Sequence, residues 1–325
     1  MDRIIRKCDL IGKIKRASIC QKRHLYLKIW KKCSPSMFWA HPKLISRLWF
    51  ASQKGYLPNL SHPRDFNELL IKLNLESMNQ PVLKNKRVQC ADKFAVRDYI
   101  ASIGLSSILN RIYGVYNCFD DISFDTLPNQ FVLKMTTGCG QNFICSNKSE
   151  LDVNNVKKSF TQWYNDASVF GLLTGEWHYS LIKPRIIAEE YLNSIGENTS
   201  IIDYKFHCIK GKVVGILVCY DRDKEKKQAN FDLYDISWHL TDGIFPQYHK
   251  KRRSIPKPSS LEQMIVIAQK ISSGFDYVRV DLYEINGKPV FGEMTFTPAG
   301  NVMTKYQPWV MKKMLNIYYG MEDYI

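Results

Sequence analysis

Two strand-like segments near the end of the chain constrain its fold more than any other feature. The segment FDYVRVDLYEI (275–285) is followed by Asn286-Gly287 and then by PVFGEMTF (289–296). Asn-Gly between alternating apolar residues is the strongest short-range signal for a β-hairpin. In the first strand Val278, Val280 and Leu282 share one face, which is expected to enter the core. The opposite face carries Tyr277, Arg279, Asp281 and Tyr283.

The connection between these strands decides whether their carboxylates meet. A plain two-residue turn at Asn286-Gly287 places Asp281 and Glu293 on opposite faces of the hairpin, because side chains alternate along each strand. A three-residue loop or a β-bulge places them on the same face, directly opposite each other. A metal site built on both carboxylates requires the second arrangement. The alternative interpretation is an exposed ion pair between Arg279 and Asp281 on a half-buried strand.

Two carboxylates on adjacent strands with an arginine beside them suit a divalent metal that holds nucleotide phosphates. Mg²⁺ prefers oxygen ligands and commonly takes one or two carboxylates together with phosphate oxygens. A neighbouring arginine can stabilise the negative charge that develops at a reacting centre. The hairpin is therefore the first candidate for a functional site.

The rest of the pattern predicts an α/β protein of the α+β type with two or three subdomains. Helical periodicity is expected over 66–75, 92–103, 151–166 and 261–271, and Ser259 to Glu262 has the spacing of a capping box at the start of the last of these. Short apolar runs predict strands at 111–116, 131–135, 185–192, 203–209 and 213–220.

The positive charge of the chain is concentrated at its beginning. Residues 1–54 contain fourteen Lys or Arg and two acidic residues, which accounts for twelve of the fifteen net positive charges. Aromatic and aliphatic residues are interleaved with these cations, so the segment fits either an anionic membrane surface or plain packing on the body. Nucleic acid ranks well below both, because charge alone specifies no such partner.

Several classes of protein are disfavoured. No stretch approaches the roughly 18 uncharged residues of a membrane span, and Lys and Arg interrupt every apolar run near the N-terminus, unlike a signal peptide. The nine cysteines include no CxxC pair and are expected to be reduced thiols. We therefore expect a cytoplasmic protein, with a peripheral position on the inner face of the plasma membrane as the alternative suggested by residues 1–54.

Five stretches, taken together and in order, resemble a known family. They are ADKFAVRDYI (91–100), LPNQFVLKMTTGCGQN (127–142), PRIIAEEYL (184–192), DYKFHCIKGK (203–212) and VRVDLYEINGKPVFGEMTFTPAGN (278–301). The last is similar to the metal-binding end of ATP-grasp enzymes such as D-alanine–D-alanine ligases. More closely, residues 55–310 resemble the TupA-like ATP-grasp proteins found among polysaccharide-biosynthesis genes.

The resemblance implies an ATP-grasp fold, in which two α+β subdomains clasp ATP. It suggests a basic helical N-terminal region (1–54) and a catalytic region (55–325). Within the catalytic region it places a lid-like subdomain at about 118–190 and a metal-binding subdomain at about 191–325.

The same resemblance implies positions for the nucleotide. Lys134 would contact the phosphates, under a flexible loop that contains Gly138 and Gly140. Lys93 and Arg97 would supply phosphate-binding cations from a helix. The adenine would lie against a hinge, and the ribose against an acidic residue; the positions that match are Glu189, Glu190 and Leu192 for the hinge and Asp203 for the ribose.

The metal and catalytic roles follow from the resemblance in the same way. Asp281 and Glu293 would ligate Mg²⁺, Arg279 would stabilise the transition state, and Lys205 would face the phosphates or the acceptor. Thr295 stands where the ligases carry an Asn metal ligand, and its hydroxyl would be a weaker ligand. The TupA-like pattern, however, resembles GEMTFTP as it stands here.

Three functions are compared. The leading one is an ATP- and Mg²⁺-dependent carboxylate–amine ligase that acts through an acyl phosphate; the family suggests a uronic acid of a surface polysaccharide or its precursor as carboxylate and an amino acid as amine. The first alternative is a glycosyltransferase of capsular polysaccharide synthesis, for which Asp221-Arg222-Asp223 provides a literal DxD. The second is a non-catalytic membrane-surface scaffold with a degenerate nucleotide fold, to which HKKRR (249–253) would contribute.

Overall fold

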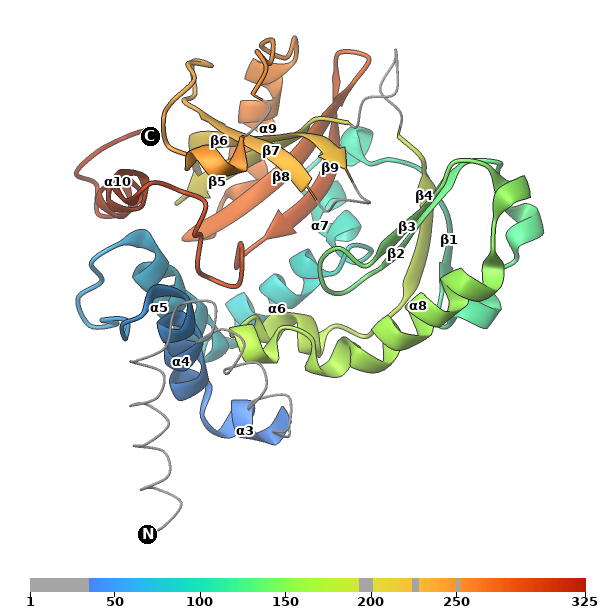
Figure 1. Ribbon diagram of the computed structural model, residues 1–325, viewed down its shortest axis with the longest axis horizontal. Helices are drawn as coiled ribbons and strands as arrows, with labels where there is room; N and C mark the ends of the chain where they lie inside the picture. Colours follow the sequence, from blue (N-terminus) through green and yellow to red (C-terminus); the bar gives the residue numbers. More distant parts are fainter. Residues whose placement is uncertain (1–34, 193–200, 224–227, 250–251) are drawn as a thin grey trace.

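Two antiparallel β-sheets, joined and covered by helices, form the molecule (Figure 1). The computed structural model describes residues 35–192, 201–223, 228–249 and 252–325. The smaller sheet has the strand order β1-β4-β2-β3 and the larger has the order β7-β6-β5-β8-β9. The strands of the smaller sheet lie within residues 112–190, and those of the larger sheet lie within residues 203–295.

The four-stranded sheet has one covered face. Its strands are β1 (Ile112–Tyr116), β2 (Phe131–Met135), β3 (Asn142–Cys145) and β4 (Ile186–Glu190). Helix α8 (Val153–Asp166) packs on one face through Val156 and Phe160, which join the inward side chains of β2 and β4 in one core. Because side chains alternate, Lys134 and Glu189 lie on the opposite face.

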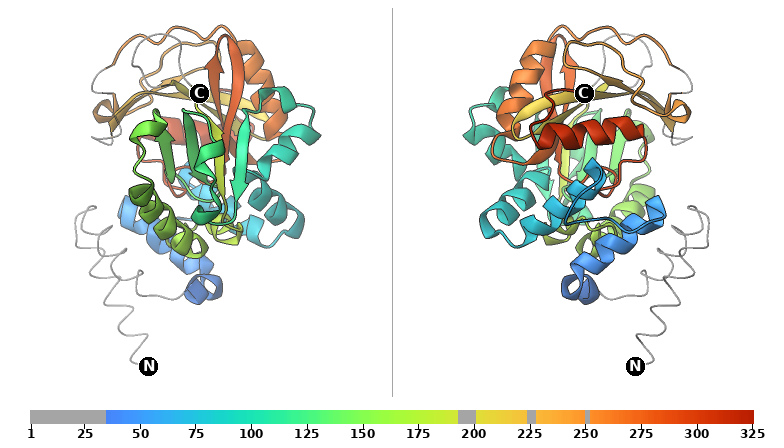
Figure 2. Two further views of the ribbon diagram at one scale, coloured as in Figure 1. Left: turned by 90° about the vertical axis from the view of Figure 1, so that its right-hand side faces the viewer. Right: turned by 90° about the vertical axis from the view of Figure 1, so that its left-hand side faces the viewer.

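Helices cover both faces of the five-stranded sheet, but they cover the second face only in part. Its strands are β5 (Asp203–Ile209), β6 (Lys212–Asp223), β7 (Gln228–Tyr234), β8 (Tyr277–Ile285) and β9 (Lys288–Thr295). Helix α9 (Leu261–Ser272) packs on one face, together with residues of α6 (Pro81–Ala91) and α7 (Val96–Ser102). Helices α5 (Phe66–Met78) and α10 (Pro308–Tyr318) cover part of the other face, as Figure 2 shows from the side of α10.

The uncovered part of that second face carries the charged residues. Along β5 and β8 the apolar side chains Ile209 and Tyr277 enter the core beneath α5 and α10. Farther along the same faces of the two strands, Lys205 lies opposite Asp281 and His207 lies opposite Arg279. One face of the sheet is therefore half core and half candidate site.

Helices at the beginning of the described chain pack against the body. Residues of α3 (Pro35–Ala40) and α4 (Pro42–Lys54) form a core with Leu172, Trp177 and Val302. The indole nitrogen of Trp49 donates a hydrogen bond of 2.7 Å to the carbonyl of Gly300. Residues 35–54 thus pack on the body. The membrane contact expected of residues 1–54 falls partly on residues 1–34, which lie outside the described residues. The domain boundaries stay predictions.

No helix in the described ranges has both the length and the apolar character needed to cross a bilayer.

The predicted strands agree closely with the structure, but strands β3 and β7 and helices α6 and α10 were not predicted. Two predictions about helices also differ from the structure. The helix expected over 92–103 begins only at Val96, because the Asp92 carboxylate accepts hydrogen bonds from the backbone amides of Phe94 and Ala95 and holds a turn there. The capping box is also wrong. The hydroxyls of Ser259 and Ser260 donate to Glu284 on β8 instead of capping α9.

Candidate active site

A β-bulge brings the two predicted metal-ligating carboxylates together. The turn itself is the two-residue type, since Ile285 pairs with Lys288 and Asn286 and Gly287 have φ of 54° and 72°. Leu282 pairs with Phe291, but the next residue back, Asp281, pairs with Glu293. The extra residue, Gly292, shifts the register by one, which confirms the same-face arrangement that the metal site requires.

Gly292 fits this position because it has no side chain. A Cβ atom there would lie 2.9 Å from the carbonyl oxygen of Asp281 and 3.0 Å from Cε2 of Tyr283. Such contacts are too close for any other residue without movement of the strands. Glycine is therefore required here by close approach of backbone, the usual reason for glycine at a bulge.

Cations surround the Asp281 carboxylate. Arg279 donates from Nε to Oδ1 at 2.6 Å and from a terminal nitrogen to Oδ2 at 2.7 Å. Lys205 bonds to the same carboxylate and also to Asp203, at 2.6 Å. Asp281 is only 1% exposed, so the alternative of an exposed ion pair does not hold. Burial lowers the pKa of Lys205, but Asp203 and Asp281 outweigh that effect and raise it above its ordinary value.

Glu293 lies at the more open side of this group. Burial raises its pKa, but Lys93, Lys205 and Arg279 together hold it below its ordinary value. The hydroxyl of Thr295 donates to Glu293 at 3.3 Å and accepts from Arg279 at 3.1 Å. Glu293 is therefore an ionised carboxylate next to Asp281, with the Thr295 oxygen beside it.

The predicted phosphate loop lies over this group. Residues 136–141 connect β2 to β3, and Gly138 and Gly140 have φ of 74° and 70°, which favours glycine. Lys93 donates from Nζ to the carbonyl of Gly138 at 2.5 Å. Cys139 is affected electrostatically by Glu293 and Arg279, which places the loop tip near the hairpin. Lys93 lies in the turn before α7, not on the expected helix.

The smaller sheet contributes an ion pair. Lys134 on β2 and Glu189 on β4 are joined at 2.5 Å, and the glutamate side chain is 7% exposed. Glu190 lies on the opposite face and is exposed, and Leu192 follows β4 half-buried. Arg97 binds the carbonyl of Asn110 at 2.7 Å. Of the predicted nucleotide contacts, Lys93, Lys134 and Glu189 act on one another electrostatically, whereas the structure does not place Glu190 with them.

The predicted ribose contact has one unused acceptor. Asp203 binds Lys205 and Arg222 through Oδ2. Its Oδ1 is buried and has no hydrogen-bond partner among the described residues. A buried carboxylate oxygen rarely lacks a donor, and a sugar hydroxyl would supply one. Together with the glycine loop and the Asp281–Glu293 pair, this oxygen fits a bound Mg–nucleotide.

The metal donor set is small. Within residues 35–192, 201–223, 228–249 and 252–325, no three His, Cys, Asp or Glu side chains are grouped closely enough to hold a metal by themselves. Two carboxylates are nevertheless a common protein contribution to Mg²⁺ when phosphates complete the shell. The residues present therefore fit a metal whose remaining ligands are water or nucleotide phosphates.

Glu176 belongs to the site but was missed by sequence reasoning. Thr174 donates to its Oε2 at 2.5 Å, and Thr297, just beyond β9, donates to its Oε1 at 3.1 Å. Glu176 and Glu293 both act electrostatically on Tyr179 and Cys139, so both carboxylates lie near the phosphate loop. Periodicity could not identify Glu176, because its loop meets Thr297 only in the folded chain.

The ionisation of Glu176 predicts a pH-dependent stability. Burial raises its pKa from 4.5 to about 7, against the two threonine hydrogen bonds that lower it. The folded state therefore holds this proton more tightly than the unfolded chain, and stability falls as pH rises from 4.5 to about 7. Glu176→Gln removes that loss. We expect the variant to be more stable than wild type by about 1 kcal/mol near pH 5.5 and about 3 kcal/mol near pH 8.5.

Urea unfolding of both proteins at the two pH values measures this difference. Equal pH dependence of the two proteins would contradict the assignment of a raised pKa to Glu176.

The histidines near the site are structural. His207 is fully buried, with Nδ1 2.9 Å from the Tyr277 hydroxyl and Nε2 2.6 Å from that of Tyr306. Burial first, and then Arg279 and Lys205, lower its pKa to about 3, so it is neutral. A structural role for His207 therefore fits its contacts better than a catalytic role. Trp177, His178 and Tyr179 are likewise buried in packing.

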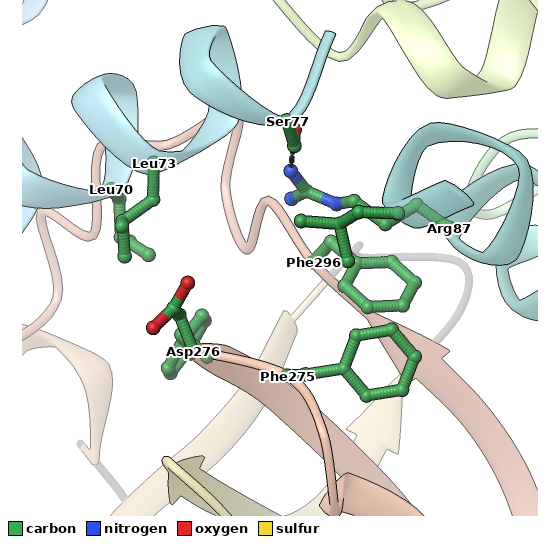
Figure 3. Close-up of a pocket in the computed structure, with 9 residues that line it drawn as sticks. Leu70, Leu73, Ser77, Arg87, Phe275, Asp276 and Phe296 are labelled. Carbon is green, nitrogen blue, oxygen red and sulfur yellow. Dashed lines mark hydrogen bonds between the residues drawn. The ribbon is translucent and has the colours of Figure 1, made fainter. Parts of the chain in front are cut away.

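A small cavity lies between α5, α6 and the start of β8 (Figure 3). It measures about 20 Å³, room for about one water, and Arg87 and Phe296 are among its lining residues. The Arg87 guanidinium lies 4.9 Å from the ring centre of Phe296 and bonds to Ser77. This cavity is too small for a substrate; Arg87 instead supports Phe296, which directly follows β9.

A glycine-rich loop thus lies beside a bulged hairpin that carries two carboxylates, an arrangement that fits a metal and a nucleotide. The chain belongs to the TupA-like ATP-grasp family, whose sequence description matches residues 72–315. It is thus an ATP-grasp ligase-like protein with the α+β fold of that family. No protein of curated function matches it.

Several solved structures are similar to part of this chain. D-alanine–D-alanine ligase from Bacillus anthracis has 14% identity and a TM-score of 0.42 over 72% of this chain and 64% of its own. The Helicobacter pylori enzyme has 14% identity and a TM-score of 0.44, over 81% and 68%. L-amino acid ligase from Bacillus licheniformis has 12% identity and a TM-score of 0.41, over 75% and 49%. The match thus spans less than two thirds of the Bacillus anthracis ligase and about half of the Bacillus licheniformis enzyme.

Proposed function

We propose that the protein is an ATP- and Mg²⁺-dependent carboxylate–amine ligase that acts through an acyl phosphate. The observation that carries this proposal is the bulge that sets Asp281 directly opposite Glu293, with Arg279 bound to both. Family membership supports the same class of reaction. Mg²⁺ bound with the nucleotide would neutralise phosphate charge and polarise the transferred group.

The position of each residue indicates which part of the metal and nucleotide it binds. Asp281 and Glu293 hold the metal, with Thr295 as a weaker oxygen ligand. Lys93 and Lys134 contact phosphates beneath the loop of Gly138 and Gly140. The negative charge of the phosphates attracts the Lys205 and Arg279 cations, which in the ligand-free protein are bound to Asp281.

The nucleoside end lies toward the smaller sheet and the start of β5. Asp203 accepts a ribose hydroxyl through its unused Oδ1. The segment Glu189 to Leu192 holds the adenine, through Glu189 and the backbone after β4. Arg97, which Glu189 affects electrostatically, is the third proposed phosphate-binding cation.

The reaction transfers the γ-phosphoryl group of ATP to an oxygen of the carboxylate substrate, which releases ADP. The amine nitrogen then attacks the carbonyl carbon, and phosphate leaves with the electron pair of the broken C–O bond. Arg279 stabilises the charge that develops in both steps. Binding of both reactants beside one metal supplies the orientation that makes the steps fast.

We assign the substrates by family resemblance. The carboxylate belongs to a uronic acid in a surface polysaccharide or its precursor, and the amine is an amino acid. The proposed place of action is the cytoplasm. There the basic residues 1–54 would bring the enzyme to the anionic inner face of the plasma membrane; their first 34 residues lie outside the described part of the chain.

The test uses the full chain with ATP, Mg²⁺, oligoglucuronate and a mixture of the twenty amino acids. We expect ADP release that needs all components and a product heavier than oligoglucuronate by one amino acid less water. ADP release with no amide product in any mixture would reject the ligase.

Glycosyl transfer has no specific support. Within the DxD sequence, Asp221 forms an ion pair with Arg253 at 3.1 Å, and Arg222 binds Asp203. Turnover of a nucleotide sugar without ATP would be the result that favours it. Of the HKKRR sequence invoked for a scaffold, residues 250 and 251 lie outside the described residues.

A further inference from the structure

Glu176 is a half-buried carboxylate that the proposed roles leave unused. Its two oxygens accept hydrogen bonds from Thr174 and Thr297. Among the described residues, no lysine, arginine or histidine contributes to its ionisation. Burial of a carboxylate without a neighbouring cation favours its protonated form and raises its pKa, and groups with such raised pKa values cluster at functional sites.

The loop that carries Glu176 is held rigidly. Asn74 donates to the carbonyl of Gly175 at 2.6 Å. On the facing loop, Trp49 fixes Gly300, where an added Cβ would come within 3.2 Å of Cβ of Thr174. Helices α4 and α5 therefore fix the two loops that meet at Glu176. Such a carboxylate is preorganised for one ligand geometry.

The position of Glu176 suits the reacting centre but not the metal. It shares Tyr179 and Cys139 as electrostatic neighbours with Glu293 and Arg279. It does not join Asp281 and Glu293 in a three-carboxylate group, since the described residues contain none. Glu176 therefore suits a positively charged ligand that needs a single carboxylate. An ammonium group is such a ligand, and it has three hydrogen-bond donors for this acceptor.

We propose that Glu176, held by Thr174 and Thr297, binds the ammonium group of the amine co-substrate and takes one of its protons. This inference rests on the proposed ligase function. The lone pair that the proton leaves on nitrogen forms the C–N bond, and the C–O bond to phosphate breaks with its electrons on phosphate. The second nitrogen proton goes to the departing phosphate or to water. Glu176, whose pKa is raised to about 7 by burial, is a base of suitable strength near neutral pH.

Hydroxylamine separates this role from formation of the acyl phosphate. Hydroxylamine is uncharged near neutral pH and attacks an acyl phosphate without a base, giving a hydroxamate. With ATP, Mg²⁺ and oligoglucuronate, Glu176→Gln should form hydroxamate within about twofold of wild type. With the amino-acid mixture its amide formation should fall about 100-fold or more. Glu262→Gln, an exposed glutamate with its side chain 73% exposed, is the matched control and should match wild type in both.

The outcomes distinguish the two proposals. Parallel loss of hydroxamate and amide in Glu176→Gln, or no loss of amide, would overturn the role of Glu176. Absence of hydroxamate from wild type would reject the ligase instead. A second measurement then still tests the site: ammonium chloride should raise the melting temperature near pH 8.5 above that in sodium chloride for wild type but not for Glu176→Gln. No ammonium-specific effect on wild type would also overturn the proposal.

Discussion

Gly292→Ala is expected to weaken metal-dependent nucleotide binding strongly while leaving the protein folded. The added Cβ would lie 2.9 Å from the Asp281 carbonyl oxygen, so the strands must separate or the bulge must move. Loss of the bulge returns Glu293 to the opposite face, because a one-residue slip reverses every side chain. We expect affinity for Mg–ATP to fall at least tenfold, and the free energy of unfolding to fall by about 1–3 kcal/mol.

A second glycine provides the matched control. Gly211 lies in the β5–β6 turn with φ of 79°, and an added Cβ would meet its nearest atom at 3.7 Å. Gly211→Ala should therefore lose about 1 kcal/mol through backbone strain and keep its affinity for Mg–ATP. Calorimetric titration and urea unfolding measure both quantities. Normal Mg–ATP binding by Gly292→Ala would show that the bulge does not set the site.

Lys205→Met is expected to destabilise the ligand-free protein more than any surface change. Lys205 bonds to both Asp203 and Asp281, which are 3% and 1% exposed. Removal of a buried cation leaves carboxylates without their full compensation and costs about 3–5 kcal/mol. Mg²⁺ binding to Asp281 and Glu293 would replace the lost positive charge. The variant should therefore gain more stability from Mg²⁺ than wild type gains.

Urea unfolding with and without Mg²⁺ tests both statements. Lys212→Met, at the exposed start of β6, is the control and should change stability by less than about 0.5 kcal/mol. A Lys205→Met protein as stable as wild type would contradict the assigned ion-pair network. A large loss that Mg²⁺ does not offset would contradict the assignment of Asp281 as a metal ligand.

The sequence predicted the strands well because their signals are local. The Asn286-Gly287 turn and the alternation of Val278, Val280 and Leu282 define the hairpin without reference to the rest of the chain. Local sequence signals could not distinguish a longer loop from a bulge in this hairpin. It depends on the approach of Gly292 to Asp281 across two strands, which no single-strand pattern contains.

The other differences have similar causes. The Asp92 side chain accepts a hydrogen bond from the backbone amide of Phe94 and stabilises a turn, so α7 begins only at Val96. Ser259 binds Glu284, a residue distant in sequence, instead of its helix. Glu176 joins the candidate site only through its hydrogen bond with Thr297, which forms in the folded chain. In each case a contact between distant segments, or a side chain competing with the backbone, decides the result.

The central claim is that Asp281 and Glu293 together hold the metal of a bound nucleotide. Isothermal titration of ATP, with and without Mg²⁺, into wild type, Asp281→Ala and Glu293→Ala tests it most directly, with circular dichroism to confirm that each variant is folded. We expect metal-dependent binding in the micromolar range by wild type that weakens at least about tenfold, or about 1.4 kcal/mol, in both variants. No binding by folded wild type, or equal metal-dependent binding by all three proteins, would contradict it.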